Sequence, residues 1–145
     1  MSDANLALAK RWFEEVWNKS RRDAIDEMLA PHALLHEGGS SMEGPAGFKP
    51  FFDRMHSAFS EIHVTVEDAV AQGDKVCVRW SCSLRHTGDG FGIGATGRRA
   101  TISGMTLVRI EGGRFVEGWQ NWDMLGLMQM LQETPMAPTY VAASA

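Results

Sequence analysis

Three segments in the first half of the chain repeat their apolar residues at helical spacing, which predicts three amphipathic helices. The first covers residues 4–18. The second is short, covers residues 24–29 and ends before Pro31. The third begins with Pro45 at its first position, and its apolar stripe consists of Phe48, Phe51, Phe52, Met55 and Phe59.

After Ser60 the apolar period changes to two residues, which is typical of strands. Strands are expected over residues 62–70, 75–86, 100–110 and 115–121. A turn at Gly73 and a hairpin at residues 111–114 separate them, and a short helix over residues 124–131 follows. Earlier in the chain, we expect residues 33–36 to be extended and residues 38–41 to form a loop.

Helices followed by a strand meander predict an α+β domain. We expect a cone-shaped, barrel-like curved sheet, mixed or antiparallel, with three helices packed on its concave face. Because such a sheet and its helices need not meet at the open end, an internal pocket is expected there. Residues 1–132 would form this single domain, and residues 133–145 a mobile tail.

Composition and charge exclude several classes of function. The chain has 145 residues, of which 44% are apolar, and a formal net charge of −4. The acidic balance argues against a nucleic-acid partner, since such proteins usually carry a basic face. No segment approaches the roughly 20 apolar residues that span a bilayer. We therefore expect a cytoplasmic protein that binds neither nucleic acid nor membrane.

The two cysteines lie on one predicted strand at an odd separation. Alternation sends Cys77 and Cys82 to opposite faces of the sheet, so they are not expected to form a disulfide. This fits a reducing compartment and gives no cysteine metal site. His32 and His36 have the spacing of a helical zinc pair, but Pro31 argues against a helix there. We expect no metal site.

Residues 92–97 match the dinucleotide-binding pattern G-x-G-x-x-G. A strand follows them instead of the helix whose amino terminus would hold a pyrophosphate, so the sequence context excludes this function. The glycine-rich segment from Gly88 to Gly97 is better interpreted as a flexible hairpin loop that lids the pocket.

Candidate chemistry is concentrated near the end of the last strand. If the extended conformation continues, one strand face carries Phe115, Glu117, Trp119, Asn121 and Asp123. A carboxyl group beside tryptophans loses hydration, which raises its pKa and suits a general acid or base. The alternative for Asp123 is purely structural, because it immediately precedes a predicted helix and can serve as its N-cap.

Two histidines are further candidates. His36 ends a short extended segment, where a side chain either points into a cavity or packs at the surface. His86 ends the apolar face of the strand at residues 75–86, so it either lines the pocket or marks the point where the strand meets solvent.

Several short motifs, in this order and spacing, resemble the SnoaL-like polyketide cyclase or ester cyclase group of the nuclear transport factor two-like superfamily. The resemblance covers residues 6–131, and its motifs are Phe13–Asn18, Gly73–Val76, Val78–Trp80, His86–Gly88, Gly97–Arg99, Trp119–Asp123, Leu125–Leu127 and Leu131. It implies an α+β cone with a deep apolar pocket, commonly dimeric through the outer sheet face.

The resemblance also implies a reaction: closure of a ring by intramolecular aldol condensation, without metal or cofactor. In such cyclases an aspartate at the position of Asp123 works with a nearby histidine. This chain departs from the pattern, because its penultimate strand has no histidine at residues 105–109. Only His36 or His86 can substitute.

The leading hypothesis is a cofactor-free enzyme that acts on a small, apolar carbonyl compound. Asp123 would be the acid or base, with His36 or His86 as its partner, and Asn121 would donate a hydrogen bond to the enolate oxygen. The residues expected to contact the ligand are Trp12, Trp80, Met105, Trp119 and Asn121.

Three alternatives remain open from the sequence. The chain could be a non-catalytic protein that binds a small hydrophobic ligand, or an isomerase or epoxide hydrolase on the same fold. It could also be a dimerisation module whose aromatic residues only fill a core. In each case we expect a homodimer, because the alternate face of the strand at residues 75–86 is too polar for a core.

Overall fold

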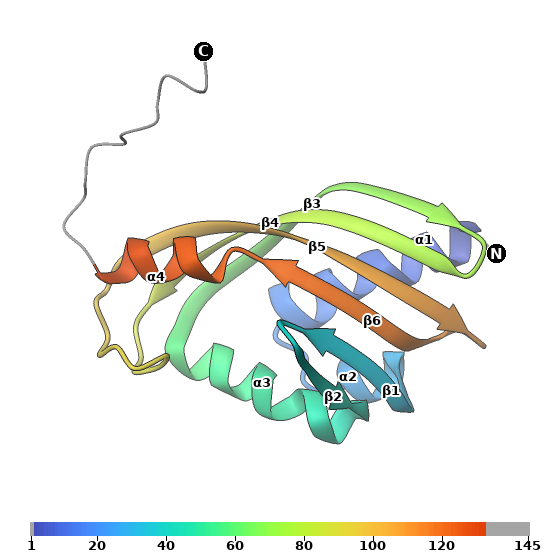
Figure 1. Cartoon of the computed structure of the whole chain (residues 1–145), viewed down its shortest axis with the longest axis horizontal. Coiled ribbons are helices and arrows are strands. Elements are labelled where there is room, and N and C mark those ends of the chain that lie inside the picture. Colours follow the sequence, from blue (N-terminus) through green and yellow to red (C-terminus); the bar gives the residue numbers. More distant parts are fainter. Residues whose placement is uncertain (1, 133–145) are drawn as a thin grey trace, which may run out of the picture.

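The computed structural model describes residues 2–132 (Figure 1). The predicted tail at residues 133–145 lies outside the described residues. Within residues 2–132, no helix is long and apolar enough to cross a membrane.

The first predicted helix forms in two parts. Ser2–Arg11 is an α-helix, α1, and Trp12–Asn18 continues as a π-helix, η1. Phe13 and Val16 are buried, as their spacing predicts. Asn18 then fastens the helix end to strand β3: its side-chain nitrogen donates to the Val64 carbonyl at 2.9 Å, and its oxygen accepts from the Val64 amide at 2.6 Å.

The other two helices of the first half also form. Helix α2 spans Ala24–Met28 and α3 spans Gly44–Ala58, with Pro45 in the first turn as expected. The phenylalanine stripe of α3 is buried against the sheet. A last helix, α4, spans Met124–Gln132 and packs on strand β5.

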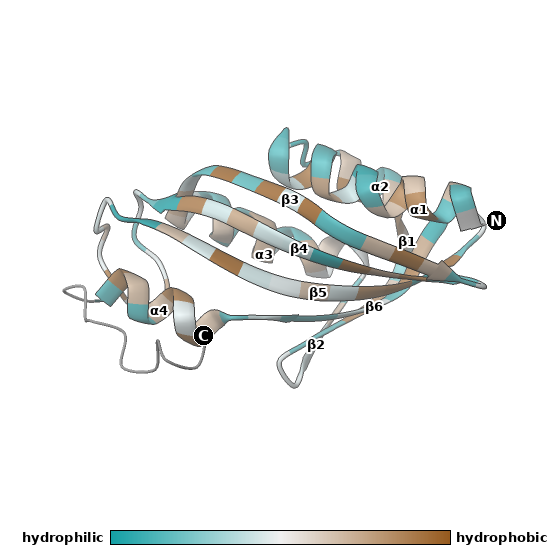
Figure 2. Ribbon diagram, turned by 90° about the horizontal axis from the view of Figure 1, so that it is seen from above, coloured by the Kyte–Doolittle hydropathy of each residue, from teal (hydrophilic) through white to brown (hydrophobic). Residues whose placement is uncertain are grey.

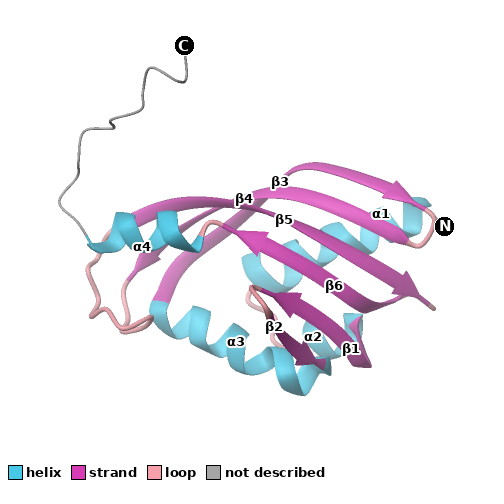
Figure 3. Cartoon of the chain, in the orientation of Figure 1, coloured by secondary structure: helices cyan, strands magenta, loops and turns pink. Residues whose placement is uncertain are grey.

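Six strands form one curved sheet, which does not close into a barrel (Figure 3). They are β1 (Leu29–Glu37), β2 (Ser40–Glu43), β3 (Phe59–Gln72), β4 (Lys75–His86), β5 (Arg99–Glu111) and β6 (Arg114–Trp122). Their order is β2-β1-β6-β5-β4-β3. All neighbours are antiparallel except β1 and β6, which run parallel, so the sheet is mixed. The predicted α+β class with a curved sheet is confirmed.

Hydrophobic and hydrophilic residues alternate along β3 in Figure 2, as expected for a strand with one buried face. On β4, the predicted apolar face from Val76 to His86 is buried, and the intervening residues are exposed or half-buried. The buried face of the sheet meets α1, η1, α2 and α3 to make the core. Cys82 lies on the buried face and Cys77 on the outer face, and both are free thiols. Their predicted separation is confirmed.

Two local features differ from the sequence-based expectation. Strand β1 begins directly after α2 and contains Pro31, so the extended segment is longer than predicted. The predicted loop at residues 38–41 is shorter than expected: residues 38 and 39 form a tight turn, and residues 40 and 41 already belong to β2, which pairs with β1. Gly44 allows the chain to turn from β2 into α3: its φ is +64°, and a Cβ there would lie 2.1 Å from the Pro31 carbonyl oxygen.

Candidate active site

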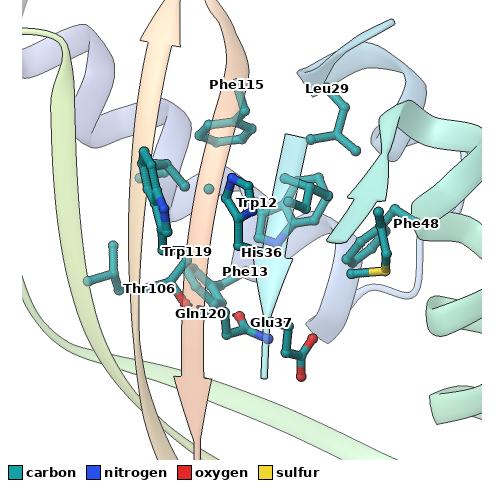
Figure 4. A pocket seen from close by; sticks show the side chains of 16 residues that line it. Trp12, Phe13, Leu29, His36, Glu37, Phe48, Thr106, Phe115, Trp119 and Gln120 are labelled. Atoms are coloured by element: carbon teal, nitrogen blue, oxygen red, sulfur yellow. Dashed lines mark hydrogen bonds between the residues drawn. The ribbon is translucent and has the colours of Figure 1, made fainter. Parts of the chain in front are cut away.

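The interior of the cone holds two adjacent cavities. The first lies between η1, β1, β5 and β6 and opens partly to solvent (Figure 4). Its apolar walls include Trp12, Phe13, Leu35, Phe48, Val108 and Phe115. The second lies towards β3 and β4. Phe13 and Gln120 border both cavities, so they form the partition between them.

A chain of hydrogen bonds crosses this partition. The Trp80 indole nitrogen donates to the Thr106 hydroxyl at 3.0 Å, and the hydroxyl donates to Gln120 Oε1 at 3.0 Å. Because an indole N–H can only donate, the Thr106 oxygen accepts from Trp80 and directs its own proton to Gln120. The Gln120 Nε2 amide is thereby left to donate to a bound molecule.

Glu37 is the carboxylate that borders the first cavity. It lies two residues after Leu35 on β1, so alternation turns it towards the same inner face. In the parallel ladder Glu37 is opposite Gln120. The Trp122 indole nitrogen donates a hydrogen bond to Glu37 Oε2 and so fixes the orientation of the carboxylate. The cavity therefore presents one anchored carboxylate and one anchored amide, side by side, in apolar surroundings.

All three tryptophans predicted to contact a ligand border the cavities, Trp12 and Trp119 the first and Trp80 the second. Trp12 lines the first cavity, with its ring against Phe48 at 5.1 Å and Phe115 at 5.6 Å between centroids. Trp80 lines the second cavity. Gly104 lies beside it, and a Cβ there would be 2.5 Å from the Trp80 ring, so glycine makes room for the indole.

The predicted common face of β6 is broken by a bulge at Val116. Phe115 pairs with Ile110, but Glu117 already pairs with Arg109, so one extra residue is accommodated. The bulge reverses the alternation. Phe115 faces inward, while Glu117 and the residues in step with it face outward.

Three other predicted site residues follow that reversed register. Trp119, Asn121 and Met105 lie on the outer side of the sheet, in step with each other and out of step with Gln120. Met105 is 51% exposed and Asn121 is exposed, so neither projects into the interior cavities. Trp119 nevertheless also lines the first cavity, next to Gly118.

His36 joins this outer cluster instead of meeting Asp123. Its ring stacks on Trp119 with centroids 5.5 Å apart, and its Nε2 lies 2.8 Å from Glu117 Oε2. Arg109 lies on the other oxygen of Glu117 at 3.5 Å. The hydrogen bond from His36, supported by Arg109, lowers the pKa of Glu117 from its ordinary value of 4.5.

His86 is fully buried at the far end of β4, and it borders neither interior cavity. Its Nδ1 accepts the Thr96 amide at 3.2 Å and contacts the Thr96 hydroxyl at 3.1 Å. Its Nε2 has no hydrogen-bond partner among residues 2–132. The loop from Gly88 to Gly97 therefore packs around His86, and no described residue of this loop borders the interior cavities.

Asp123 occupies the capping position that was the structural alternative for it. Its Oδ1 accepts the Gly126 amide at 2.9 Å, at the start of α4. The residue is exposed and borders neither interior cavity. Thus Trp12, Trp80, Trp119 and His36 border the interior cavities, whereas Asp123 and His86 border neither of them.

The residues that sequence reasoning missed are Glu37, Thr106 and Gln120. A signal for Glu37 was present, because it follows Leu35 at a spacing of two. Thr106 similarly precedes Val108 by two residues. Gln120 was not considered, because the bulge at Val116, which turns it inward, has no local sequence signature.

Known proteins share this sequence and fold. The aklanonic acid methyl ester cyclase DnrD of Streptomyces peucetius is 30% identical over 126 residues, which cover 82% of this chain and 85% of that protein. The structure of TsrD from Streptomyces laurentii is 27% identical with a TM-score of 0.80, covering 90% of this chain and 96% of TsrD. An NTF2-like protein from Burkholderia pseudomallei, 16% identical, shares the fold with a TM-score of 0.75 over 92% of this chain and all of its own.

The sequence profile of the SnoaL-like polyketide cyclases matches residues 7–131, which is nearly the whole described chain. The match spans both helices and strands of the cone, and it includes Glu37, Thr106 and Gln120. The chain therefore belongs to the SnoaL-like polyketide cyclase family.

Proposed function

We propose that the protein is an enzyme of cyclase or isomerase type that performs acid–base chemistry on an apolar carbonyl compound, with Glu37 as the general base. The observation that carries the proposal is the pair of Glu37 and Gln120. They lie on adjacent strands at the edge of the apolar cavity, each held by a hydrogen bond from the protein. A base beside a hydrogen-bond donor is what enolisation of a carbonyl compound requires.

The proposed reaction is a ring closure without loss of atoms. Glu37 removes a proton from a carbon next to a carbonyl group, and Gln120 Nε2 donates a hydrogen bond to the resulting enolate oxygen. The enolate carbon then forms a bond to a second carbonyl carbon of the same molecule. The new alkoxide takes the proton back from Glu37. In this scheme Trp122 keeps the carboxylate oriented, and Trp12 and Phe115 hold the flat apolar part of the substrate.

Similarity to DnrD suggests the first compound to test. That relative carries the name aklanonic acid methyl ester cyclase, and the likeness extends over most of both chains. We propose an aromatic carbonyl compound of this kind as the substrate class. The aromatic walls of the first cavity, which include Trp12, Phe48 and Phe115, support this choice.

Turnover of aklanonic acid methyl ester by wild type, Glu37→Gln and Glu43→Gln tests the proposal. Glu43 lies nearby on β2 but pairs with His32 outside the cavities, so it is a matched control. We expect Glu37→Gln to lower kcat by about 10²- to 10⁴-fold, the usual contribution of a general base. Glu43→Gln should remain close to wild type. Wild-type turnover by Glu37→Gln would contradict the role of Glu37.

A non-catalytic binding protein is the second candidate function, and one observation favours it. The polar groups on the partition between the cavities, Trp80, Thr106 and Gln120, are all neutral, and Glu37 stands at the edge. If wild type binds aromatic carbonyl compounds but neither cyclises them nor exchanges their protons, this second function is the correct one.

A further inference from the structure

An open groove leads from solvent to the interior cavities, between the middle of α3 and the ends of β1 and β6. The residues that line it include Glu37, Met42, Phe51, Arg54, Gln120 and Trp122. The groove shares Glu37, Met42 and Gln120 with the first cavity, and Phe51, Gln120 and Trp122 with the second. We therefore take it as their entrance. Among the residues that line the groove, Glu37 and Arg54 are the ones that carry a charge.

Arg54 is held by aromatic rings and by no carboxylate of the described chain. Its guanidinium carbon lies 5.6 Å from the centroid of the Phe51 ring and 5.8 Å from that of Phe91. Arg22, which precedes α2, behaves differently, since it forms an ion pair at 2.9 Å with Asp53, the neighbour of Arg54 on α3. Within residues 2–132, no such ion pair forms at Arg54.

One of the two rings, that of Phe91, belongs to the loop at residues 88–97, and the backbone of Phe91 is strained. Phe91 has a φ of +55°, which is rare for a bulky side chain. Its ring packs on Phe59 with centroids 5.7 Å apart. Gly90 lets the loop approach α3, because a Cβ there would lie 2.6 Å from the Ala58 side chain. Strain of this kind persists where the surrounding structure enforces it, commonly at functional sites.

We propose that Arg54 binds a carboxylate on the molecule that enters the pocket, so that the preferred ligand is an aromatic acid. The inference rests on the proposed function: within its class of aromatic carbonyl compounds, a free acid should bind more tightly than the corresponding methyl ester. The two rings hold the guanidinium at the entrance, and its N–H groups remain able to donate two parallel hydrogen bonds to a carboxylate. The apolar part of the ligand then reaches towards Gln120, and the acid group stays at the mouth.

This preference is opposite to the one that the overall charge predicts. With a formal net charge of −4, and with Glu37 in the same groove, the protein should repel an anion unless a local cation attracts it. A tighter binding of the acid than of its neutral ester would therefore be a specific signature of Arg54.

Calorimetric titration with 2-naphthoic acid and methyl 2-naphthoate tests this signature at neutral pH. We expect wild type to bind the acid about fivefold more tightly than the ester, in the range of a partly exposed charge pair, and less so at high salt. Arg54→Gln should lose the preference and keep its affinity for the ester. Arg114→Gln, which removes an exposed arginine at the far β5–β6 hairpin, should keep both. Phe91→Leu should weaken the preference.

Each other outcome overturns a defined part of the inference. An unchanged preference in Arg54→Gln, or equal binding of both compounds to wild type, would contradict carboxylate binding by Arg54 and leave the proposed function intact. An unchanged preference in Phe91→Leu would remove the loop from the site. If wild type binds neither compound, the aromatic substrate class fails, and the inference fails with it.

Discussion

Gln120 presents its amide nitrogen to the pocket because each group behind it has one available role. The indole of Trp80 can only donate, the hydroxyl of Thr106 passes the hydrogen bond on, and Gln120 Oε1 accepts it. The amide is thus oriented before any ligand arrives. Preorganised donors of this kind stabilise a developing negative charge without having to rearrange.

At the same scale, the buried thiol of Cys82 should be inert. Burial raises its pKa to about 11, so at neutral pH very little of the reactive thiolate is present. In a Cys77→Ser variant, Cys82 is the one cysteine that can react with a thiol reagent. We expect it to react with a thiol reagent after unfolding in denaturant, and hardly at all before. Rapid labelling of the folded variant would show that the second cavity is open to solvent there.

The outer pair of His36 and Glu117 predicts a pH dependence of stability. The hydrogen bond from His36 lowers the pKa of Glu117 in the folded protein, so the unfolded chain binds a proton more readily. The stabilisation is therefore complete above the unfolded pKa of about 4.5 and is lost as the pH falls through the lower folded value.

Urea unfolding of wild type and Glu117→Gln between about pH 6 and pH 3 measures this contribution. We expect the stability difference between the two proteins to shrink as the pH falls. A difference that stays constant over this range would contradict the assigned cause.

At the scale of elements, Asp123 fits two sequence patterns: an acid or base on a strand face, and the N-cap of the helix that follows. It accepts the Gly126 amide at the start of α4, and asparagine caps helices about as well as aspartate. We expect Asp123→Asn to keep both stability and turnover, and Asp123→Ala to lose about 1 kcal/mol of unfolding free energy. If Asp123→Asn folds normally but has no activity, the carboxylate is catalytic after all.

Helices and strands were predictable from the sequence where the spacing of apolar residues stays the same along the whole element. The stripe of α3 and the alternation of β4 are both uninterrupted, and the structure follows them closely. Strand β6 has the bulge at Val116, which depends on its pairing with β5 and moves Trp119 and Gln120 to the opposite faces from those expected. The parallel contact of β1 with β6, which brings Glu37 beside Gln120, joins segments far apart in the sequence and has no local signal.

At the scale of the whole molecule, the outer face of the sheet carries an apolar row. Val70, Cys77, Leu107 and Trp119 are paired in succession across four strands, and Val70 is 65% exposed. Contiguous apolar surface of this kind commonly marks an interface. We propose that a second copy of the chain covers it in a symmetric homodimer, in which each subunit offers the same row.

Light scattering of wild type and Leu107→Lys tests this assembly. A lysine in the row would bring like charges together across the two-fold axis, so we expect a dimer for wild type and a monomer for the variant at micromolar concentration. Cys77 should also react faster with a thiol reagent in the variant, because its row is no longer covered. A monomeric wild type would contradict the proposal.

The central claim is that Glu37 takes a proton from a carbon next to a carbonyl group in the pocket. Nuclear magnetic resonance can follow this step alone, as uptake of deuterium from D₂O by an apolar aromatic ketone such as 2-tetralone. We predict that wild type accelerates the exchange, and that Glu37→Gln binds the ketone equally well but exchanges it at least about 100-fold more slowly. Exchange at the wild-type rate by Glu37→Gln would contradict the account.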